Sequence, residues 1–252
     1  MSPQFVDFNA DGKDDIVAGT FDGSPHLALA AGKGWKKPEH ILDAKGQRIM
    51  MNQYWHYEKK EWLNTNRCDP EGGPKLGGHL TSAWAWDHDG DGDLDLLLGD
   101  YDQGRVLLRV NDGKPGAPKF RERNEILEAD GKPIAAGKIS TLRMIDWDGD
   151  KDMDLVISTA GDSYGDGKGG GVHLFLNTGK PGQLKFAAKT DLIAPAAKAM
   201  TAEPTRPDAG LYVDIADADG DHDLDMIVGG YSFNEEKKRE PYVWFYENAG
   251  GE

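Results

Sequence analysis

The sequence predicts an all-β protein made of repeated units, and three observations carry this prediction. An Asp-rich loop recurs four times along the chain, each copy is followed by a short apolar strand, and no segment has the pattern of a long amphipathic helix. Short apolar runs bounded by Gly, Asn and Asp are typical of strands and turns. We expect residues 1–252 to form a single domain, because 252 residues suffice for one such core.

Four segments align when the Asp-rich loops are placed in register. The resulting repeat units cover approximately residues 1–80, 81–138, 139–208 and 209–252. The first aspartates of the four loops are separated by 80, 59 and 71 residues. This spacing is too irregular for a stacked solenoid, in which repeats have a nearly constant length. It fits the blades of a propeller, because blades tolerate connecting loops of different lengths.

The second unit illustrates the strands expected within each repeat. Apolar strands are predicted at Ser82–Trp86, Leu94–Leu98 and Arg105–Val110, separated by the acidic loop and by a turn with glycine. A fourth strand is predicted at Lys119-Phe120, and at Lys185-Phe186 in the third unit. Four antiparallel strands make one blade. The predicted fold class is therefore all-β, a β-propeller of four-stranded antiparallel blades with four recognisable repeat units.

Two details concern the connections between units. The segments Ile41–Gly46 and Ile126–Gly131 match each other and occupy the same place after the first and second units. The last unit stops at Glu252 without a fourth strand. Either another part of the chain completes that sheet or the chain is cut from a longer propeller, and the sequence leaves both explanations open.

Alternate positions of the Asp-rich loops carry the oxygen atoms that calcium prefers. Counted from the first aspartate, positions 1, 3, 5 and 9 are acidic except for Asn9, and position 7 adds a backbone carbonyl. Calcium takes about six to eight oxygen ligands, and alternate side chains of a tight loop can converge on one point. We therefore predict up to four Ca2+ ions. The predicted metal ligands are Asp7, Asn9, Asp11, Lys13 and Asp15; Asp87, Asp89, Asp91, Asp93 and Asp95; Asp146, Asp148, Asp150, Asp152 and Asp154; and Asp217, Asp219, Asp221, Asp223 and Asp225.

The acidic pattern has a simpler interpretation, because Asp and Gly are also common in solvated turns. Four copies in one register argue against it, and so does the repulsion between carboxylates a few ångströms apart without a cation. Magnesium prefers a strict octahedron with several retained waters, and zinc lacks its usual Cys and His cluster here. Four calcium ions would change the net charge from −15 to −7.

The chain resembles a known repeat family through the motif Asp-x-Asp-x-Asp-Gly-x-x-Asp followed by apolar residues, as in Asp87–Leu96. This is the FG-GAP and VCBS repeat family, whose β-propellers also occur in the head of integrin α subunits. The resemblance covers most of the chain. It implies a structural calcium in the loop between the first two strands of each blade, on the face away from the loops that meet ligands.

The chain departs from the family pattern at a few positions. Asn9 replaces one carboxylate, and Lys151 and His222 stand at position 6, where the family usually has glycine. A left-handed backbone is predicted at these two residues, at a cost of about 1 kcal/mol each. Gly149 and Gly220, at position 4, are expected to ease the turn. The Phe-Gly…Gly-Ala-Pro segment of the family name is not evident, which favours the VCBS label.

Composition and affinity together restrict the partners and the location. The net charge of −15 argues against nucleic acid and anionic membranes, because both require positive charge. No stretch approaches the roughly 20 apolar residues of a membrane span, so no membrane insertion is expected. Cys68 is the only cysteine, which excludes an intrachain disulfide.

Weak calcium modules, with Kd of about 10⁻⁴–10⁻³ M, work where calcium is abundant. We therefore expect an extracellular, cell-surface or periplasmic location.

The connector Asn52–Cys68 is the segment best suited to binding a ligand. Its aromatic residues alternate with Asn, Gln and Arg, which is typical of sugar-binding surfaces and of hot spots that bind proteins. The opposite explanation is that its aromatic rings pack onto neighbouring blades as a satellite core. The candidate ligand-binding residues are Tyr54, Trp55, Tyr57, Trp62 and Arg67.

The function expected from these patterns is recognition of a glycan or protein by a non-enzymatic module. A carbohydrate-active enzyme is one alternative, because some polysaccharide lyases use propellers of this family. Such an enzyme would need Tyr57 or His56 to converge with Arg67, and the spacing shows no convergence. No nucleophile motif such as Gly-x-Ser-x-Gly is present. A purely architectural domain of a larger protein is the other alternative.

Overall fold

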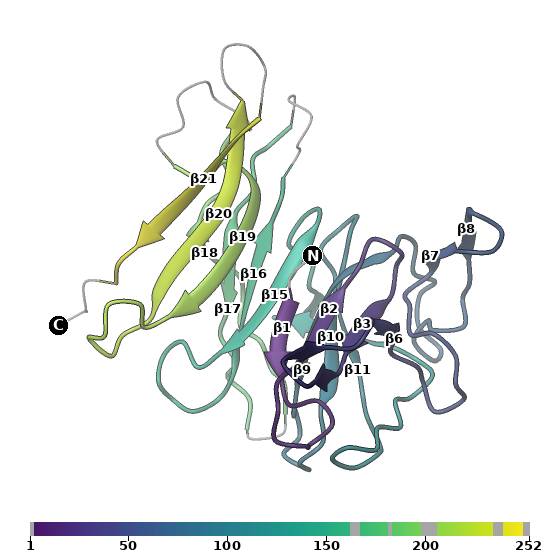
Figure 1. Cartoon of the computed structure of the whole chain (residues 1–252). Helices are drawn as coiled ribbons and strands as arrows, with labels where there is room; N and C mark the ends of the chain where they lie inside the picture. The colour runs from purple at the N-terminus through teal and green to yellow at the C-terminus, as the bar shows by residue number, and fades with distance from the viewer. Residues whose placement is uncertain (1–2, 162–166, 181–182, 198–205, 234–238, 249–252) are drawn as a thin grey trace.

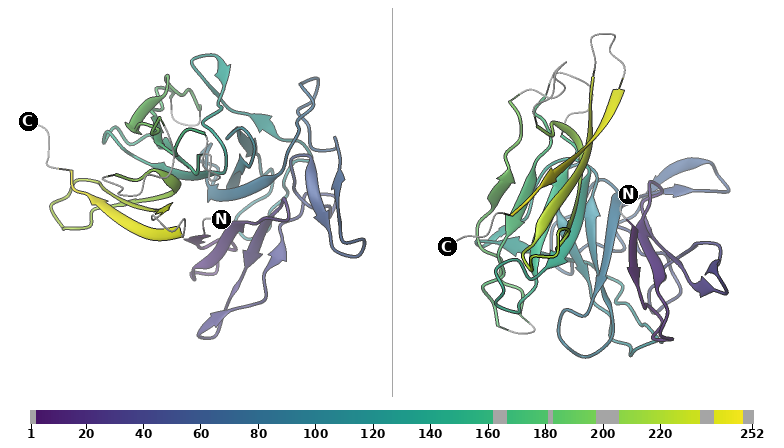
Figure 2. Two further views of the ribbon diagram at one scale, coloured as in Figure 1. Left: turned by 90° about the horizontal axis from the view of Figure 1, so that it is seen from above. Right: turned by 60° about the vertical axis from the view of Figure 1, so that its left-hand side comes forward.

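The computed structural model describes residues 3–161, 167–180, 183–197, 206–233 and 239–248, and these residues form strands and loops only. Four small antiparallel sheets are arranged in chain order as the blades of a β-propeller (Figures 1 and 2). The predicted fold class is therefore confirmed. Within this described part, no helix is long and apolar enough to cross a lipid bilayer.

Each blade pairs its strands as an antiparallel meander. Blade 1 contains β1 (Pro3–Val6), β2 (Asp15–Gly19), β3 (Pro25–Ala28) and β6 (Glu39–His40). Blade 2 contains β9 (Leu80–Trp86), β10 (Asp95–Asp100), β11 (Val106–Arg109) and β12 (Glu125–Ile126). Blade 3 contains β15 (Ser140–Ile145), β16 (Asp154–Thr159), β17 (Val172–Phe175) and β18 (Thr190–Ile193). Among its described residues, blade 4 contains β19 (Ala209–Ala216), β20 (Asp225–Phe233) and β21 (Arg239–Tyr246).

Short hairpins lie outside these blades and belong to the loops between strands. They are β4 (Ala30–Ala31) with β5 (Gly34–Trp35), β7 (Gln53–His56) with β8 (Glu61–Asn64), and β13 (Glu128–Ala129) with β14 (Lys132–Pro133). The first strand of each blade contacts that of the next, from β1 through β9 and β15 to β19. These contacts give the blades a common orientation, so equivalent loops lie at the same end of the molecule.

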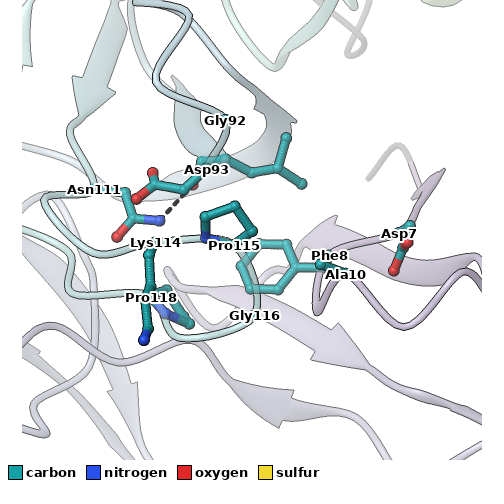
Figure 3. A pocket seen from close by; sticks show the side chains of 11 residues that line it. Asp7, Phe8, Ala10, Gly92, Asp93, Asn111, Lys114, Pro115, Gly116 and Pro118 are labelled. Carbon is teal, nitrogen blue, oxygen red and sulfur yellow. Dashed lines mark hydrogen bonds between the residues drawn. The ribbon is translucent and has the colours of Figure 1, made fainter.

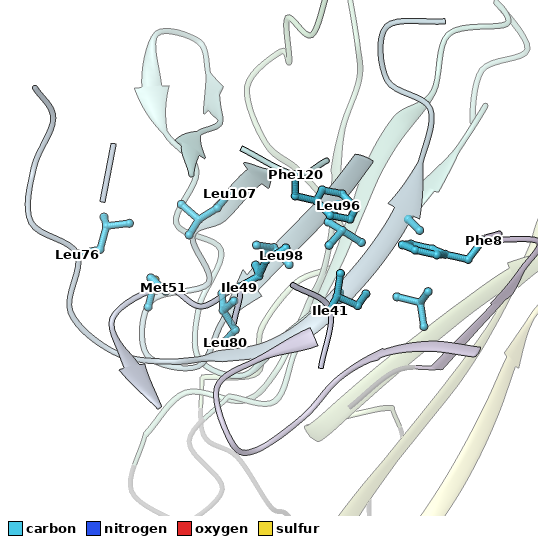
Figure 4. Packing of buried hydrophobic residues seen from close by; sticks show 13 residues of the cluster. Phe8, Ile41, Ile49, Met51, Leu76, Leu80, Leu96, Leu98, Leu107 and Phe120 are labelled. Atoms are coloured by element: carbon cyan, nitrogen blue, oxygen red, sulfur yellow. The ribbon is translucent and has the colours of Figure 1, made fainter. Parts of the chain in front are cut away.

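The core is continuous between neighbouring blades. Leu96 and Leu98 of β10 lie in one buried cluster with Phe8 and Ile41 from the first repeat unit (Figure 4). Two further clusters join blade 2 to blade 3 and blade 3 to blade 4. Every residue of β10 and β16 is buried, which is why these strands have apolar runs rather than an alternating pattern. Burial of each leucine contributes roughly 1.5–3 kcal/mol.

Blade 4 is buried on one face only. Val213 and Ile215 of β19 pack into the cluster shared with blade 3. The cross-strand register places the exposed apolar side chains of this blade together on its other face. These side chains are Tyr212, Ile227, Val243 and Phe245. The alternation in β19 therefore reflects a half-buried strand, in contrast to the central strands of blades 2 and 3.

The fourth strands predicted at Lys119-Phe120 and Lys185-Phe186 are wrong. The fourth strands are β12 and β18, which begin several residues later. Phe120 and Phe186 form isolated bridges instead, each to the asparagine that follows the third strand of its own blade. Their rings are buried in the clusters between blades, so packing rather than continuous pairing determines their position.

The two matching connectors receive the same bridge from the next blade. Phe120 pairs in parallel with Asp43 of Ile41–Gly46, and Phe186 pairs in parallel with Ala129 of Ile126–Gly131. The carbonyl of each phenylalanine accepts a hydrogen bond from the connector, from the Ala44 N–H at 2.9 Å and the Asp130 N–H at 3.0 Å. The sequence match between the connectors thus reflects a repeated link between consecutive blades.

Candidate functional site

The acidic loops lie at one end of the propeller, at the lower end in Figure 1, because each joins the first and second strands of its blade. Neighbouring loops face each other across hollows. A hollow of about 30 Å³ lies between Asp7 of the first loop and Asp93 of the second, with Phe8 and Pro115 in its lining (Figure 3). Another, of about 260 Å³, lies between the second and third loops. We call this end the acidic-loop face.

The backbone of each loop enters the left-handed region at positions 4 and 6. At position 6, φ is 83° at Gly12, 90° at Gly92, 76° at Lys151 and 78° at His222. The left-handed backbone predicted at Lys151 and His222 is confirmed. At position 4 of the first loop, Ala10 has a φ of 56°. Sequence reasoning missed this residue, although the other three loops have glycine at the same place.

Backbone donors hold the loop around its carboxylates in the same way four times. The aspartate at position 1 accepts a hydrogen bond from the N–H of position 6, for example from Gly12 to Asp7 at 2.8 Å and from Lys151 to Asp146 at 3.2 Å. The aspartate at position 5 accepts one from the N–H of position 7 at 2.9–3.0 Å. The left-handed conformation of position 6 therefore directs its N–H toward the carboxylate of position 1 and holds that side chain in place.

Three of the loops bring three carboxylate oxygens within 4.8 Å of one another. The groups are Asp87, Asp89 and Asp91; Asp146, Asp148 and Asp154; and Asp217, Asp219 and Asp225. In the first loop, the Asn9 side-chain oxygen accepts a hydrogen bond from the Asp11 N–H at 3.0 Å. The position 3 aspartates of the other loops accept the equivalent bond. An amide oxygen thus occupies the place of the missing carboxylate.

Several carboxylate oxygens of these loops are buried with no hydrogen-bond partner among the described residues. They are Asp15 Oδ2, both oxygens of Asp93, Asp146 Oδ1 and Asp223 Oδ1. Burial, together with the charges of Asp91 and Asp95, raises the pKa of Asp93 to about 6. Leaving such a group unpaired costs roughly 1–3 kcal/mol or more. A bound cation would satisfy these atoms, and a donor set made of oxygen fits calcium.

The aspartate at position 9 has a structural role that is separate from a metal. In three loops its Oδ2 accepts a hydrogen bond from the N–H of position 2. In all four loops its Oδ1 accepts a hydrogen bond from an N–H just beyond the third strand of the same blade. Asp154, for example, accepts from Trp147 at 2.9 Å and from Asn177 at 2.7 Å. Position 9 therefore ties the start of the loop to the end of the same blade.

The predicted ligand-binding residues lie away from the acidic loops, but the β7–β8 hairpin separates them into two groups. Tyr54, Tyr57 and Arg67 line an open hollow of about 480 Å³. Trp55 and Trp62 are cross-strand partners with ring centroids 6.0 Å apart. Adjacent strand residues point to opposite faces, so Tyr54 and Trp55 contact different surroundings. The five residues therefore do not form one surface.

The tryptophan side of the hairpin packs on aromatic residues from the turns of blades 1 and 2. Trp62 lies 4.8 Å from the His79 ring, which stacks on Tyr101 at 4.6 Å. Phe21, in the turn after β2, lies 5.6 Å from Tyr101. Trp62 thus packs on aromatic rings of the neighbouring blades while 43% of its surface stays exposed, so this side of the hairpin is a surface cluster rather than a buried satellite core. We call the end of the propeller that carries this aromatic cluster and the hollow the opposite face.

A buried ion-pair network lies beneath the hollow. Asp22, in the turn between β2 and β3, accepts hydrogen bonds at Oδ2 from His40 Nε2 at 2.8 Å and Arg48 Nη2 at 3.0 Å. The Tyr57 hydroxyl donates to the same oxygen at 3.0 Å. Burial acts to raise the pKa of Asp22, but hydrogen bonds from His40 and Thr20 hold it well below its usual value. Sequence reasoning missed this network, because no spacing rule connects these separate turns.

The same network has the wrong composition for a metal site or a tyrosine base. Asp22, His26 and His40 are close enough to surround an ion, but the guanidinium of Arg48 already neutralises the carboxylate. Burial and the charge of Asp22 raise the pKa of Tyr57, so its hydroxyl keeps its proton at neutral pH. The network is therefore a support for the side chains above it.

Repeated four-stranded blades with an oxygen-rich loop between the first two strands define this chain as a repeat β-propeller with candidate cation sites. Residues 87–157 and 146–228 match the FG-GAP-like repeat model. The two overlapping segments cover more than half of the chain, which belongs to the FG-GAP-like repeat family. The matching model is described as an FG-GAP-like repeat, so it does not support the VCBS label that the sequence favoured. A search of curated proteins found no match.

Proposed function

We propose that this propeller is a calcium-stabilised recognition module. The observation that carries the proposal is the set of buried carboxylate oxygens that have no hydrogen-bond partner in the described part of the chain, in four loops of one geometry. Side chains at positions 1, 3, 5 and 9, with position 7, would hold the ion, and position 9 would also orient the loop. When bound, calcium supplies the positive charge that these loops lack and links strands of one blade. Its role is structural.

The location that we propose follows from the expected affinity. Loops of this kind that bind with Kd of about 10⁻⁴–10⁻³ M are filled only where calcium is in the millimolar range. Outside the cytosol, at the cell surface, in the extracellular space or in the periplasm, the loops would be occupied. Recognition of a glycan or protein would then take place on the opposite face, whose hollow is separate from the ions.

A carbohydrate-active enzyme is the second candidate, because the structure does bring His56, Tyr57 and Arg67 to one hollow. Two observations weigh against it. The pKa of Tyr57 is raised, which is the wrong direction for a base, and Arg67 is already paired with the buried Asp43. Incubation with uronate and neutral polysaccharides separates the two functions, because an enzyme would shorten one of them.

Thermal unfolding in EDTA, in calcium and in magnesium tests the structural part of the proposal. We expect the melting temperature in about 1 mM calcium to exceed that in EDTA by roughly 10 °C or more, as several sites contribute. Magnesium at the same concentration should give a smaller rise, because it dehydrates reluctantly. Equal melting temperatures in calcium and EDTA would show that the loops are only solvated turns.

A further inference from the structure

The hollow of the opposite face has the size and composition of a small-molecule site. Its volume of about 480 Å³ lies within the usual range of roughly 300–1,000 Å³ for ligand sites. Hairpin β7–β8 contributes Tyr54, and the loop at its tip contributes Tyr57. The preceding and following segments contribute Arg48 and Arg67. Aromatic rings and a few polar groups thus converge from three segments of the chain.

The two arginines of the hollow are fixed before any ligand arrives. Arg48 donates to Asp22, to the Ser24 hydroxyl at 2.9 Å and to the Trp55 carbonyl at 2.9 Å. Arg67 donates to Asp43 and to the Arg48 carbonyl. Side chains held in this way lose little conformational entropy on binding, so each hydrogen bond that they make to a ligand contributes more affinity.

The charge of the hollow decides which ligand it suits. Arg48 and Arg67 are balanced by Asp22 and Asp43 behind them, and Glu58 adds a negative charge to the lining. With neutral histidines, these five side chains carry a formal charge of −1. The whole chain carries −15, and would still carry −7 with four calcium ions. Both the local and the total charge therefore repel an anionic ligand.

The aromatic rings supply flat apolar surface at the rim. The Tyr57 side chain is among the most exposed aromatic groups, with 57% of its surface accessible. Its hydroxyl is held by Asp22, so the accessible area belongs mainly to a ring of fixed orientation. The Tyr54 ring lies under the guanidinium of Arg48, 5.4 Å from centroid to Cζ. Such rings offer large contact area at low entropic cost.

From these observations we infer that the hollow binds an uncharged oligosaccharide, an inference that rests on the recognition role proposed above. Sugar hydroxyls would accept from the guanidinium edges and donate to Glu58, and a sugar ring would lie on Tyr57. A protein partner is a poorer match, because Glu58 lies in the lining and glutamate is depleted at the centres of protein interfaces. An acidic glycan is a poorer match because of the charge balance.

Binding measurements on the full chain test the inference, in calcium and after a calcium-dependent rise in melting temperature has been verified. The probes are uncharged cello-, xylo-, manno- and galacto-oligosaccharides, compared with oligogalacturonate and alginate oligosaccharides. The variants are Tyr54→Ala and Tyr57→Ala, with Tyr212→Ala as the matched control, because Tyr212 is an exposed tyrosine on blade 4. Melting temperatures in calcium show whether each variant is folded.

We expect at least one uncharged probe to bind, with affinity reduced at least about tenfold by Tyr57→Ala and Tyr54→Ala and unchanged by Tyr212→Ala. If only the uronate probes bind, the inference of an uncharged ligand is overturned, but the proposed recognition role remains. Equal binding by folded Tyr57→Ala and wild-type protein would place the site elsewhere and also overturn it. Absence of binding to every probe, in a protein that calcium does stabilise, would reject the glycan site without affecting the calcium proposal.

Discussion

The two faces of this propeller neutralise their carboxylates in different ways. On the opposite face, three buried carboxylates have an arginine partner: Asp22 pairs with Arg48, Asp43 with Arg67 and Asp100 with Arg105. On the acidic-loop face, backbone N–H groups and a few lysine or histidine contacts are the partners given by the structure, and several oxygens remain unpaired.

With the proposed calcium sites, this difference predicts that the two faces respond differently to removal of calcium. A carboxylate paired with arginine is already neutralised, whereas three carboxylates within 4.8 Å repel one another. Substitutions on the opposite face should therefore act equally in calcium and in EDTA. Substitutions of loop side chains that hold only the ion should act in calcium alone. Position 9 is expected to break this rule, because its aspartate also holds the backbone.

Loss of the position 9 aspartate should have the largest effect. Asp154→Ala leaves the buried N–H groups of Trp147 and Asn177 without their acceptor, so we expect destabilisation of about 2–5 kcal/mol. The loss should already be present in EDTA, because the two backbone hydrogen bonds do not depend on the ion. Urea unfolding under both conditions measures it. A loss confined to calcium would mean that Asp154 acts only as a metal ligand.

The next largest effect is expected on the opposite face. Asp22→Asn removes the charge that Arg48, His40 and Tyr57 share, at a cost of about 1–3 kcal/mol with or without calcium. Because the pKa of Asp22 is lowered by folding, its stabilisation is present above the ordinary pKa near 4 and declines as the pH falls below it. The difference between wild type and variant should therefore shrink below about pH 4. A constant difference down to about pH 2 would contradict this assignment.

A position 3 substitution should distinguish the metal role from the backbone role. Asp148→Ala removes the position 3 oxygen ligand from a three-membered group, and in EDTA we expect no loss of stability, because repulsion decreases and the Asp150 N–H that it accepts from is exposed. At about 1 mM calcium, loss of a site with Kd near 10⁻⁴ M would reduce stability by about 1.4 kcal/mol. Paired unfolding curves in calcium and EDTA measure the change. An equal loss in both would assign Asp148 a structural role.

The smallest effect should be a gain. Lys151→Gly relieves the left-handed backbone, where φ is 76°, while keeping the N–H that donates to Asp146. We expect stabilisation of about 0.5–1 kcal/mol. Lys138 is an exposed lysine without a positive φ, so Lys138→Gly is the control and should be slightly destabilising. If both variants lose stability to the same extent, strain at Lys151 is negligible.

The features that the sequence predicts well are local ones. The four loops, their spacing and the strands around them depend on residues a few positions apart, and the strain at Lys151 and His222 follows from comparison with glycine in the same register. The fourth strands were misplaced because Phe120 and Phe186 are apolar residues just after a turn, like strand residues. Each forms only single bridges, one to the asparagine of its own blade and one to the preceding connector, which is far away in sequence.

The hollow could not have been found from spacing alone, because Asp22, His40, Arg48 and Arg67 come from different turns and meet only in the fold. The separation of Tyr54 from Trp55 was nevertheless available in the sequence. Gln53–His56 and Glu61–Asn64 form a hairpin, and alternation along a strand sends neighbouring side chains to opposite faces. Treating the connector as a single aromatic surface ignored that alternation.

The account depends on the claim that all four acidic loops bind calcium, and counting the ions tests it most directly. After dialysis against calcium buffer, metal analysis combined with a calorimetric titration of the EDTA-treated protein gives the number of sites per chain. We predict close to four calcium ions, including one in the first loop, where Asn9 supplies the amide oxygen. A protein that binds no calcium at millimolar concentration would contradict the account.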